Sequence, residues 1–385
     1  MYRLEGLKDL GEIAALLNAK TDFPEYKVNQ IVFDSRDAKE GDLFLPLKGN
    51  SYDAEQFVDD VLSKGAAVIS AHNHEGPAIC VEDTYKALLT LCRSKLENCR
   101  PKIIFITGSY GKTTLKDMIK HYLGNDCHSS RENENNEFGI VFTILSMESN
   151  SKFLVVECGA RKIGDFDLIA ENLFCDVFVL TSITSNHLET FKSIENIELT
   201  KLKLKQCLIH QNNFIDGRKV DEKDIKKFNK ILLMKIFKNL SLDIDIDSNE
   251  APVTEGRGNI IEKYNGKIIN QTYNAHPDTV IASLSGENPV ETIVVLGDMA
   301  ELGPNELSLH RDLLKSISEF EIFVTGKIFK QVYSEIGIGK INFFADVNEF
   351  PKKYLDKQLK SGKKIYFKGS RSSKMENYLE LLVND

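Results

Sequence analysis

The sequence lacks the features that define several classes of protein. No stretch approaches the roughly 20 consecutive apolar residues that a membrane-spanning helix needs. The first residues, MYRLEGLKDLGEIAALL, contain no basic segment followed by a long apolar core, so they do not resemble a secretion signal. The seven cysteines are scattered, odd in number and without a CxxC pair, which argues against a disulfide framework or a zinc knuckle. We therefore expect a cytoplasmic protein with reduced thiols and no membrane span.

An excess of positive charge is also missing. The chain has 49 Lys and Arg against 57 Asp and Glu, a formal net charge of -8. Binding to a nucleic-acid backbone needs concentrated Lys and Arg that displace counterions. The hydrophobic content of 42% and the charged content of 28% are those of an ordinary folded protein. We therefore expect small-molecule substrates and no nucleic acid, and the oligomeric state is not readable from the sequence.

Length and the order of apolar runs predict three α/β domains. A chain of 385 residues exceeds the usual size of one domain, about 100–200 residues. We place the domains at 1–97, 98–252 and 253–385. Strands are expected at 30–33, 43–45, 67–69, 102–107, 153–156, 177–180, 292–296, 322–325 and 364–367. The pattern predicts a small N-terminal α/β domain, a central P-loop-type domain whose mostly parallel sheet is flanked by helices, and a Rossmann-like C-terminal domain.

A phosphate-binding loop lies between the first strand and the first helix of the central domain. Its sequence is Thr107-Gly108-Ser109-Tyr110-Gly111-Lys112-Thr113-Thr114. Glycines let backbone N–H groups turn toward phosphate oxygens, and the N-terminus of the helix adds partial positive charge. In such a loop Lys112 meets the outer phosphates and Thr113 can bind magnesium. The general pattern has a glycine five residues before Gly111, where this chain has Ile106.

Two further residues are candidates for the same edge of the sheet. Glu157 ends the strand at 153–156, and ligands gather at the carboxyl ends of parallel strands, so this acid is well placed to hold a metal bound to phosphate. His187 follows the strand at 177–180, although an isolated histidine is more often structural than a ligand. Lys201 is one of several lysines in its segment and has no special standing by itself.

The order of motifs resembles the Mur ligase family along nearly the whole chain. The likeness is closest to the branch that adds D-alanyl-D-alanine. The motifs of the first domain are Asp34-Ser35-Arg36, Gly41-Asp42-Leu43-Phe44 and Leu47-Lys48-Gly49. The central domain contributes TGSYGKTT and Asn135-Asn136-Glu137-Phe138-Gly139. The last domain contributes Tyr273-Asn274-Ala275-His276-Pro277-Asp278, Leu296-Gly297-Asp298-Met299-Ala300-Glu301-Leu302-Gly303, His310-Arg311 and Lys368-Gly369-Ser370-Arg371-Ser372.

The resemblance implies an ATP-dependent amide ligase. ATP would phosphorylate the carboxylate of a nucleotide-linked donor, such as a UDP-MurNAc-peptide of peptidoglycan synthesis, and an amino acid or dipeptide amine would then displace the phosphate. By motif, Lys112, His187 and Lys201 would be catalytic. Thr113 and Glu157 would hold one magnesium ion and His187 a second, and Lys201 would match the family's carbamylated lysine.

The resemblance also implies nucleotide and substrate contacts. Asn229, Arg257, Tyr273 and Asn274 would contact the nucleotide, together with the phosphate loop. The implied substrate-binding residues are Ser35, Arg36, Lys48, Asn136, Asp298, Lys368, Ser370 and Arg371.

The chain departs from the family pattern in several places. Only about 55 residues separate Lys201 from Gly256, so the central domain is shorter than usual. Gln271 replaces an acid, Lys203 replaces a glutamate, and Asp53-Ala54-Glu55 replaces an Asp-Gly-His pattern. The changes at Gln271 and at Asp53-Ala54-Glu55 concern recognition of nucleotide and substrate rather than phosphoryl transfer, and Lys203 lies beside the lysine that matches the carbamylated one. Two alternatives to the peptidoglycan substrate therefore stay open: a ligase that acts on a different nucleotide sugar or cell-surface glycan intermediate, and a non-catalytic nucleotide-binding homologue.

Overall fold

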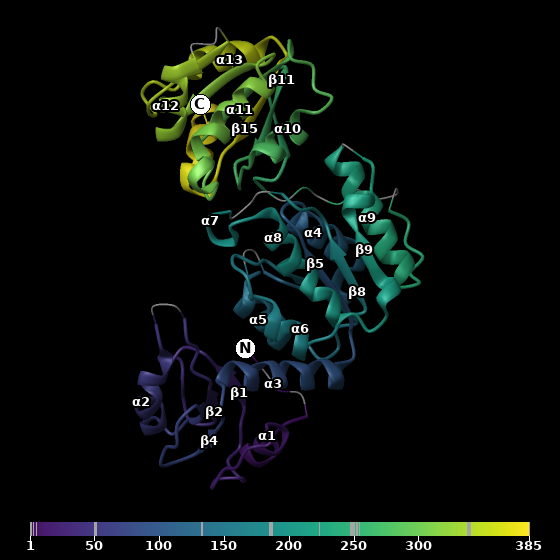
Figure 1. The fold of residues 1–385 in the computed structure, drawn as a ribbon, viewed down its shortest axis with the longest axis vertical. Helices are drawn as coiled ribbons and strands as arrows, with labels where there is room; N and C mark the ends of the chain where they lie inside the picture. The colour runs from purple at the N-terminus through teal and green to yellow at the C-terminus, as the bar shows by residue number, and fades with distance from the viewer. Residues whose placement is uncertain are drawn as a thin grey trace.

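The computed structural model describes residues 2–384 apart from 3, 5, 50–51, 132–133, 185–187, 223, 247–250, 252, 254 and 337–339. Three α/β units follow one another along the long axis of the molecule, with the N-terminal unit at the bottom of Figure 1, the central unit in the middle and the C-terminal unit at the top. The predicted α/β class with three domains is confirmed. The domain boundaries stay predictions.

The N-terminal unit contains a four-stranded parallel sheet in the order β1-β2-β3-β4. Its strands are β1 (Gln30–Val32), β2 (Asp42–Phe44), β3 (Ala67–Ser70) and β4 (Ala78–Cys80), and its helices are α1 (Leu10–Leu16) and α2 (Val58–Ser63). Helix α3 (Thr84–Cys99) leads into the central unit. It begins where the Asp83 carboxylate accepts hydrogen bonds from the N–H groups of Tyr85 and Lys86. It ends at Cys99, because the next residue, Arg100, has a left-handed backbone conformation and precedes Pro101.

The central unit contains a five-stranded parallel sheet in the order β6-β7-β5-β8-β9. The strands are β5 (Lys102–Thr107), β6 (Cys127–Ser129), β7 (Phe153–Glu157), β8 (Val177–Leu180) and β9 (Phe214–Asp216). The helices are α4 (Lys112–Leu123), α5 (Glu137–Ser146), α6 (Asp167–Asn172), α7 (Leu188–Phe191), α8 (Ile194–Leu202) and α9 (Ile225–Asn239). Strand order reverses at β5, so the loop after β5 lies at the switch point where doubly wound sheets bind ligands.

Both faces of the central sheet are buried, because successive residues of β5 pack on opposite sides. Ile103 and Phe105 join the cluster that includes residues of α5, whereas Ile104 and Ile106 join the cluster that includes residues of α4 and α9. Full burial of such a side chain contributes roughly 1.5–3 kcal/mol. This packing fixes α4, and with it the phosphate loop, against the sheet.

The C-terminal unit contains a six-stranded sheet in the order β10-β11-β15-β12-β13-β14, in which only β10 is antiparallel to its neighbour. The strands are β10 (Asn259–Lys263), β11 (Gly266–Gln271), β12 (Thr292–Gly297), β13 (Glu321–Thr325), β14 (Ile341–Phe343) and β15 (Lys364–Lys368). The helices are α10 (Pro277–Leu284), α11 (Glu306–Ser316), α12 (Lys327–Ile336), α13 (Lys352–Lys360) and α14 (Met375–Val383). Throughout the part of the chain that the structure describes, no helix is both long and apolar enough to cross a membrane.

Candidate active site

The phosphate loop connects β5 to α4 and depends on two glycines in unusual conformations. Gly108 has a φ of 144° and Gly111 a φ of 83°. A Cβ atom on Gly108 would lie 2.0 Å from the Thr181 hydroxyl oxygen, so only glycine fits there without a shift of the loop. Helix α4 begins at Lys112 and has no side-chain cap. Its first N–H groups are therefore free to bind an anion.

The loop is anchored to the segment that follows β8. The N–H of Ser109 donates to the Ser182 carbonyl at 2.9 Å, and the N–H of Tyr110 donates to the Ser182 hydroxyl at 3.0 Å. In return, the N–H of Thr184 donates to the Ser109 hydroxyl at 2.9 Å. Thr107 closes the other side, since its buried hydroxyl donates to the Cys158 carbonyl at 2.7 Å. The loop is thus preorganised.

Two lysines converge on the loop. The Lys112 and Lys201 ammonium groups donate to the same carbonyl oxygen, that of Gly108, at 2.9 and 3.2 Å. Burial lowers the pKa of Lys201 to about 7, and the nearby Lys112 charge adds to this effect. Burial also lowers the pKa of Lys112, and Arg257 contributes, while Glu157 opposes the change. A polyanion between these groups would restore full protonation of Lys112.

Glu157 lies at the carboxyl end of β7, and the residue is 1% exposed. The Thr113 hydroxyl donates to Oε2 at 2.6 Å, and Nδ2 of Asn135 donates to Oε1 at 3.0 Å. Both donors are neutral, so neither compensates the charge of the carboxylate. Mg²⁺ is usually held by one or two such oxygen ligands together with substrate phosphates. The pair of Thr113 and Glu157 fits that role, and Thr114 lines the same cavity.

Additional metal ligands are not assembled in the described residues. No group of three or more His, Cys, Asp or Glu side chains that could hold a metal occurs there. An ion at Glu157 would therefore take its remaining ligands from nucleotide phosphates and water. His187, predicted to hold a second ion, lies outside the described residues.

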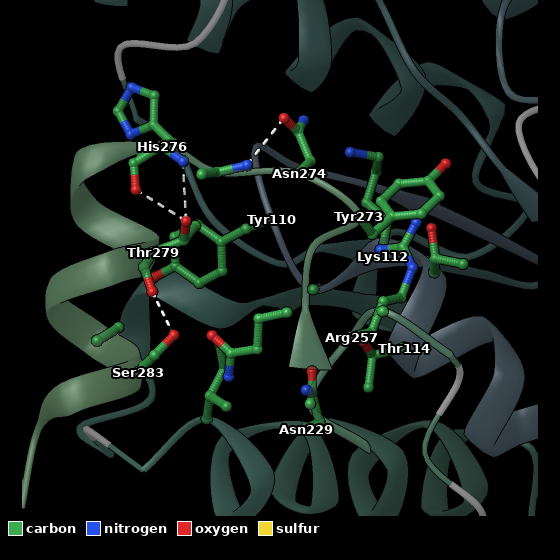
Figure 2. Close-up of a pocket in the computed structure, with 18 of the residues that line it drawn as sticks. Tyr110, Lys112, Thr114, Asn229, Arg257, Tyr273, Asn274, His276, Thr279 and Ser283 are labelled. Atoms are coloured by element: carbon green, nitrogen blue, oxygen red, sulfur yellow. Dashed lines mark hydrogen bonds between the residues drawn. The ribbon is translucent and has the colours of Figure 1, made fainter. Parts of the chain in front are cut away.

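A large cavity extends from the phosphate loop to the C-terminal unit. Its volume is about 990 Å³, and residues of the central and C-terminal units line it together. Asn229 on α9 lies at the bottom of the view in Figure 2. It is 3% exposed, and its Oδ1 atom is buried without a hydrogen-bond partner among the described residues. An unsatisfied buried acceptor is costly, so this oxygen is suited to a donor on a bound ligand.

The C-terminal wall of the cavity is cationic. The Arg257 guanidinium carbon lies 3.8 Å from the centre of the Tyr273 ring, a cation–π contact close to Lys112 in Figure 2. The Lys368 ammonium donates to Gln271 at 3.0 Å, and burial, with a smaller effect from Arg257, lowers its pKa to about 7. Asn274 also lines the cavity, and its side chain accepts from the N–H of Ala275 at 2.9 Å. Ser370 and Arg371 complete this wall.

Five of the predicted substrate-binding residues are not among those that line the cavity. In the N-terminal unit, Arg36 is exposed and paired with Asp34 at 2.5 Å, and Lys48 is exposed and paired with Asp53 at 2.9 Å. Ser35, which precedes Arg36 in the sequence, is buried, and its carbonyl oxygen accepts a hydrogen bond from the Lys64 ammonium group. These residues follow β1 and β2, which lie in the lower unit of Figure 1, whereas the phosphate loop connects β5 to α4 in the middle unit.

The other two predicted residues outside the cavity are helix caps. Asn136 accepts a hydrogen bond from the N–H of Gly139 at 2.9 Å and begins α5. The Asp298 carboxylate accepts from the N–H groups of Ile328 and Phe329 at 3.1 and 3.0 Å, at the start of α12. Both observations give these side chains a structural task, and their roles toward substrate stay predictions.

Sequence reasoning assigned no role to several residues of the cavity, among them Asn135 and Tyr110. Asn135 is one of two adjacent asparagines, and the structure uses one as a helix cap and the other as a partner of Glu157. Tyr110 projects from the phosphate loop into the cavity toward Thr279 of α10, as Figure 2 shows. The sequence contained a signal for Asn135: a helix needs only one capping side chain at its start, so the second of two adjacent asparagines is available for another role. No comparable signal marked Tyr110.

Comparison with protein families gives two matches. The Mur ligase middle domain matches residues 106–270, and the Mur ligase, glutamate ligase domain matches residues 256–371. Together these matches cover the phosphate loop, Glu157, Lys201 and the cationic wall.

Individual proteins give matches over nearly the full chain. The UDP-N-acetylmuramoyl-tripeptide–D-alanyl-D-alanine ligases of Rickettsia prowazekii and Bacillus subtilis are both 26% identical, over 91% and 98% of this chain and 94% and 98% of their own lengths. The second alignment runs over 450 residues, so the relative contains segments that this chain of 385 residues lacks.

Solved structures give the same result. The MurF ligase of Thermotoga maritima in complex with ADP superposes with a TM-score of 0.80 at 25% identity, over 92% of this chain and 97% of its own. A crystal structure of MurF from Acinetobacter baumannii gives 0.83 at 23% identity, over 99% of this chain and 100% of its own, and so shares the fold.

Proposed function

Because the chain belongs to the Mur ligase family, we propose that it is the ADP-forming ligase that adds D-alanyl-D-alanine to a UDP-N-acetylmuramoyl-tripeptide in peptidoglycan synthesis. Relatives that match nearly the whole chain are named for this reaction. The cytoplasm, where ATP and nucleotide-linked precursors occur, is the compartment that the proposal implies.

One observation carries the proposal: the phosphate loop, Lys112 and the Thr113–Glu157 pair lie in a single cavity that the C-terminal unit closes. Phosphoryl transfer is catalysed mainly by positioning and by charge stabilisation. A nucleotide alone would need only the loop. A buried carboxylate beside the loop and a cationic wall opposite suit a triphosphate that must give up its terminal group.

The reaction then has two balanced steps. An oxygen of the donor carboxylate attacks the terminal phosphorus of ATP, and ADP leaves. The amine nitrogen of the dipeptide attacks the carbonyl carbon of the acyl-phosphate, inorganic phosphate leaves with the bridging oxygen, and the nitrogen loses a proton. Activation is needed because a free carboxylate is a poor electrophile. Lys112 stabilises the charge that develops on the transferred group.

Thr113 and Glu157 would hold the magnesium ion of the nucleotide, which when bound neutralises charge on the outer phosphates. Asn229, Tyr273 and Asn274 would contact the nucleoside, and Arg257 the phosphates. A second ion at His187 belongs to the proposal as well.

We also propose that Lys201 is carbamylated and that the carbamate binds metal. Its formation requires the neutral amine, which attacks CO₂ and releases a proton. A pKa of about 7 supplies that neutral form near physiological pH, whereas an ordinary lysine would be almost fully protonated. The group would then change from a cation beside Lys112 to an anion that can bind metal.

Substrates would approach from the two outer units. We assign the donor to Ser35, Arg36 and Lys48 of the N-terminal unit together with Asn136 of the central unit, and the amine to the C-terminal unit. The residues assigned to the amine are Asp298, Lys368, Ser370 and Arg371. Domain movement must bring the N-terminal residues nearer to the phosphate loop.

The test is a ligation assay with purified protein, ATP, magnesium, UDP-N-acetylmuramoyl-tripeptide and D-alanyl-D-alanine. We expect one amide product per ADP by mass spectrometry, and loss of the product in Lys112→Ala. Lys102→Ala is the matched control, because that exposed lysine forms a surface ion pair with Asp176 and is not among the residues that line the cavity. Turnover of other nucleotide-linked acids instead would indicate a different ligase, and nucleotide binding without turnover of any acid would contradict the enzyme assignment.

A further inference from the structure

A chain of buried polar groups lies directly behind Glu157. Its members are Lys116, Ser130 and Thr143, which are 4%, 2% and 1% exposed. None of them is among the residues that line the cavity. They cannot touch a bound nucleotide there, and the function proposed above assigns them no role.

Lys116 is the first member. It lies on α4 three residues after Thr113, so the two side chains share one face of the helix. Its ammonium group donates to the Ser130 carbonyl at 2.9 Å and lies 3.0 Å from the carboxylate of Asp117. Burying an ammonium group is costly unless it is paired and hydrogen-bonded. An apolar side chain would fill the same space at a lower cost, which argues against stability as its only purpose.

Ser130 is the second member and joins three elements. Its hydroxyl oxygen accepts a hydrogen bond from the backbone N–H of Glu157 at 2.9 Å and lies 3.1 Å from the Thr143 hydroxyl on α5. Its own N–H donates to the carbonyl of Val155, two residues before Glu157 on β7. Ser130 therefore fixes the end of β7 at the residue whose carboxylate faces Thr113.

These contacts close a ring. Thr113 on α4 donates to the Glu157 carboxylate, the Glu157 N–H donates to Ser130, and Ser130 accepts from Lys116, which returns the ring to α4. The side chain and the backbone of Glu157 are thus both tied to the same helix. Rotation or sliding of α4 against β7 would have to break one of these buried hydrogen bonds.

We propose that Lys116 and Ser130 are positioning residues that hold the Glu157 carboxylate in register with Thr113, so that the two can share one magnesium ion. The inference rests on the proposed function, because it concerns the metal of that site. Both residues act through Glu157 and have no contact of their own with metal or nucleotide. Outer partners of this kind commonly change metal affinity by about 10- to 100-fold.

A neighbouring lysine provides a matched control. Lys120 lies one turn further along α4, and its ammonium group also donates to backbone carbonyls, those of Gly124 and Cys127. It anchors α4 to the start of β6, but it makes no contact with Ser130 or Glu157. Lys120→Met therefore removes a comparable structural contact from the same helix without opening the ring.

The experiment compares Lys116→Met, Lys120→Met and the unmodified protein. Manganese replaces magnesium, and its binding in the presence of ADP is followed by electron paramagnetic resonance. ADP affinity in EDTA and melting temperature are measured in parallel. We expect Lys116→Met to weaken manganese binding about tenfold or more with metal-free ADP affinity unchanged, and Lys120→Met to leave manganese binding unchanged. Lys116→Arg, which keeps a donor, should recover part of the loss.

Three results separate the possibilities. Manganese affinity that is unaltered in a folded Lys116→Met protein overturns the positioning role, and so does an equal loss in both methionine variants. Failure of the unmodified protein to bind manganese with ADP contradicts the proposed function instead. Should Lys116→Met not fold, Ser130→Ala opens the ring at its other link, and the same weakening of manganese binding is required of it.

Discussion

Replacement of Gly108 by alanine tests how far the phosphate loop depends on its backbone geometry. At a φ of 144°, a residue with a side chain costs about 1–3 kcal/mol. The added Cβ would also lie 2.0 Å from the Thr181 hydroxyl oxygen and 2.9 Å from the Ser182 nitrogen. These atoms belong to the segment that anchors the loop, so the loop must move away from it.

The cost of that movement can be worked out from the anchor. A displaced loop gives up the hydrogen bonds from Ser109 and Tyr110 to Ser182, at about 1 kcal/mol each. With the backbone strain, the conformation that binds phosphate becomes less stable by about 3–5 kcal/mol. Since every 1.4 kcal/mol is a factor of ten, affinity for Mg·ADP should fall roughly 100-fold or more.

Isothermal titration calorimetry with Mg·ADP measures this loss. Gly124→Ala is the control, because Gly124 also has a positive φ, of 58°, but a Cβ there meets nothing within 4 Å. It should lower the melting temperature slightly and leave the affinity unchanged. A Gly108→Ala protein that binds Mg·ADP within about threefold of the unmodified affinity would refute the reasoning, because the whole computed cost would then be missing.

Three other variants test separate parts of the site. Glu157→Gln removes the metal-binding charge and keeps the shape, so the rate of ADP release with all substrates present should fall by roughly two orders of magnitude; an unchanged rate would exclude the residue as a magnesium ligand. Lys201 should take up carbon-13-labelled CO₂ increasingly as pH rises through about 7, because its neutral fraction grows there; an NMR carbamate signal that persists in Lys201→Ala would disprove the assignment. Asp298→Ala uncaps α12 and should cost roughly 1–2 kcal/mol, visible as a lower melting temperature, with the Kd for Mg·ADP unaltered; a large loss of ADP affinity would show that the carboxylate does more than cap.

The inner strands of the three sheets, apart from β11, could be predicted from the sequence, whereas five of the six edge strands, all except β1, could not. All nine predicted runs coincide with strands. Strands buried on both faces form continuous apolar runs, as Ile103–Ile106 does in β5. The six strands without a prediction are β4, β6, β9, β10, β11 and β14, and all but β11 lie at sheet edges. An edge strand is short and partly solvated, and its neighbour is set by distant pairing, so the local pattern does not mark it.

Some residues of the site could likewise be predicted from the sequence, and others could not. The phosphate loop and Glu157 could be predicted because local sequence places them at strand ends. The convergence of Lys201 on the Gly108 carbonyl could not be derived from spacing, because the two residues are 93 positions apart. Lys116 and Ser130 gave no signal at all, since an amphipathic helix commonly carries a lysine at such a position and only the packing of α4 on β7 buries it.

The most direct test of the ligase follows oxygen atoms through the reaction. The donor carboxylate is labelled with oxygen-18, ATP and D-alanyl-D-alanine are added, and the phosphate released is analysed by mass spectrometry. Attack of the carboxylate on the terminal phosphorus predicts one labelled oxygen in each phosphate and one left in the new amide. Unlabelled phosphate, with ADP formed at the same rate whether or not donor is present, would show that water takes the phosphoryl group and that the cavity does not activate an acid.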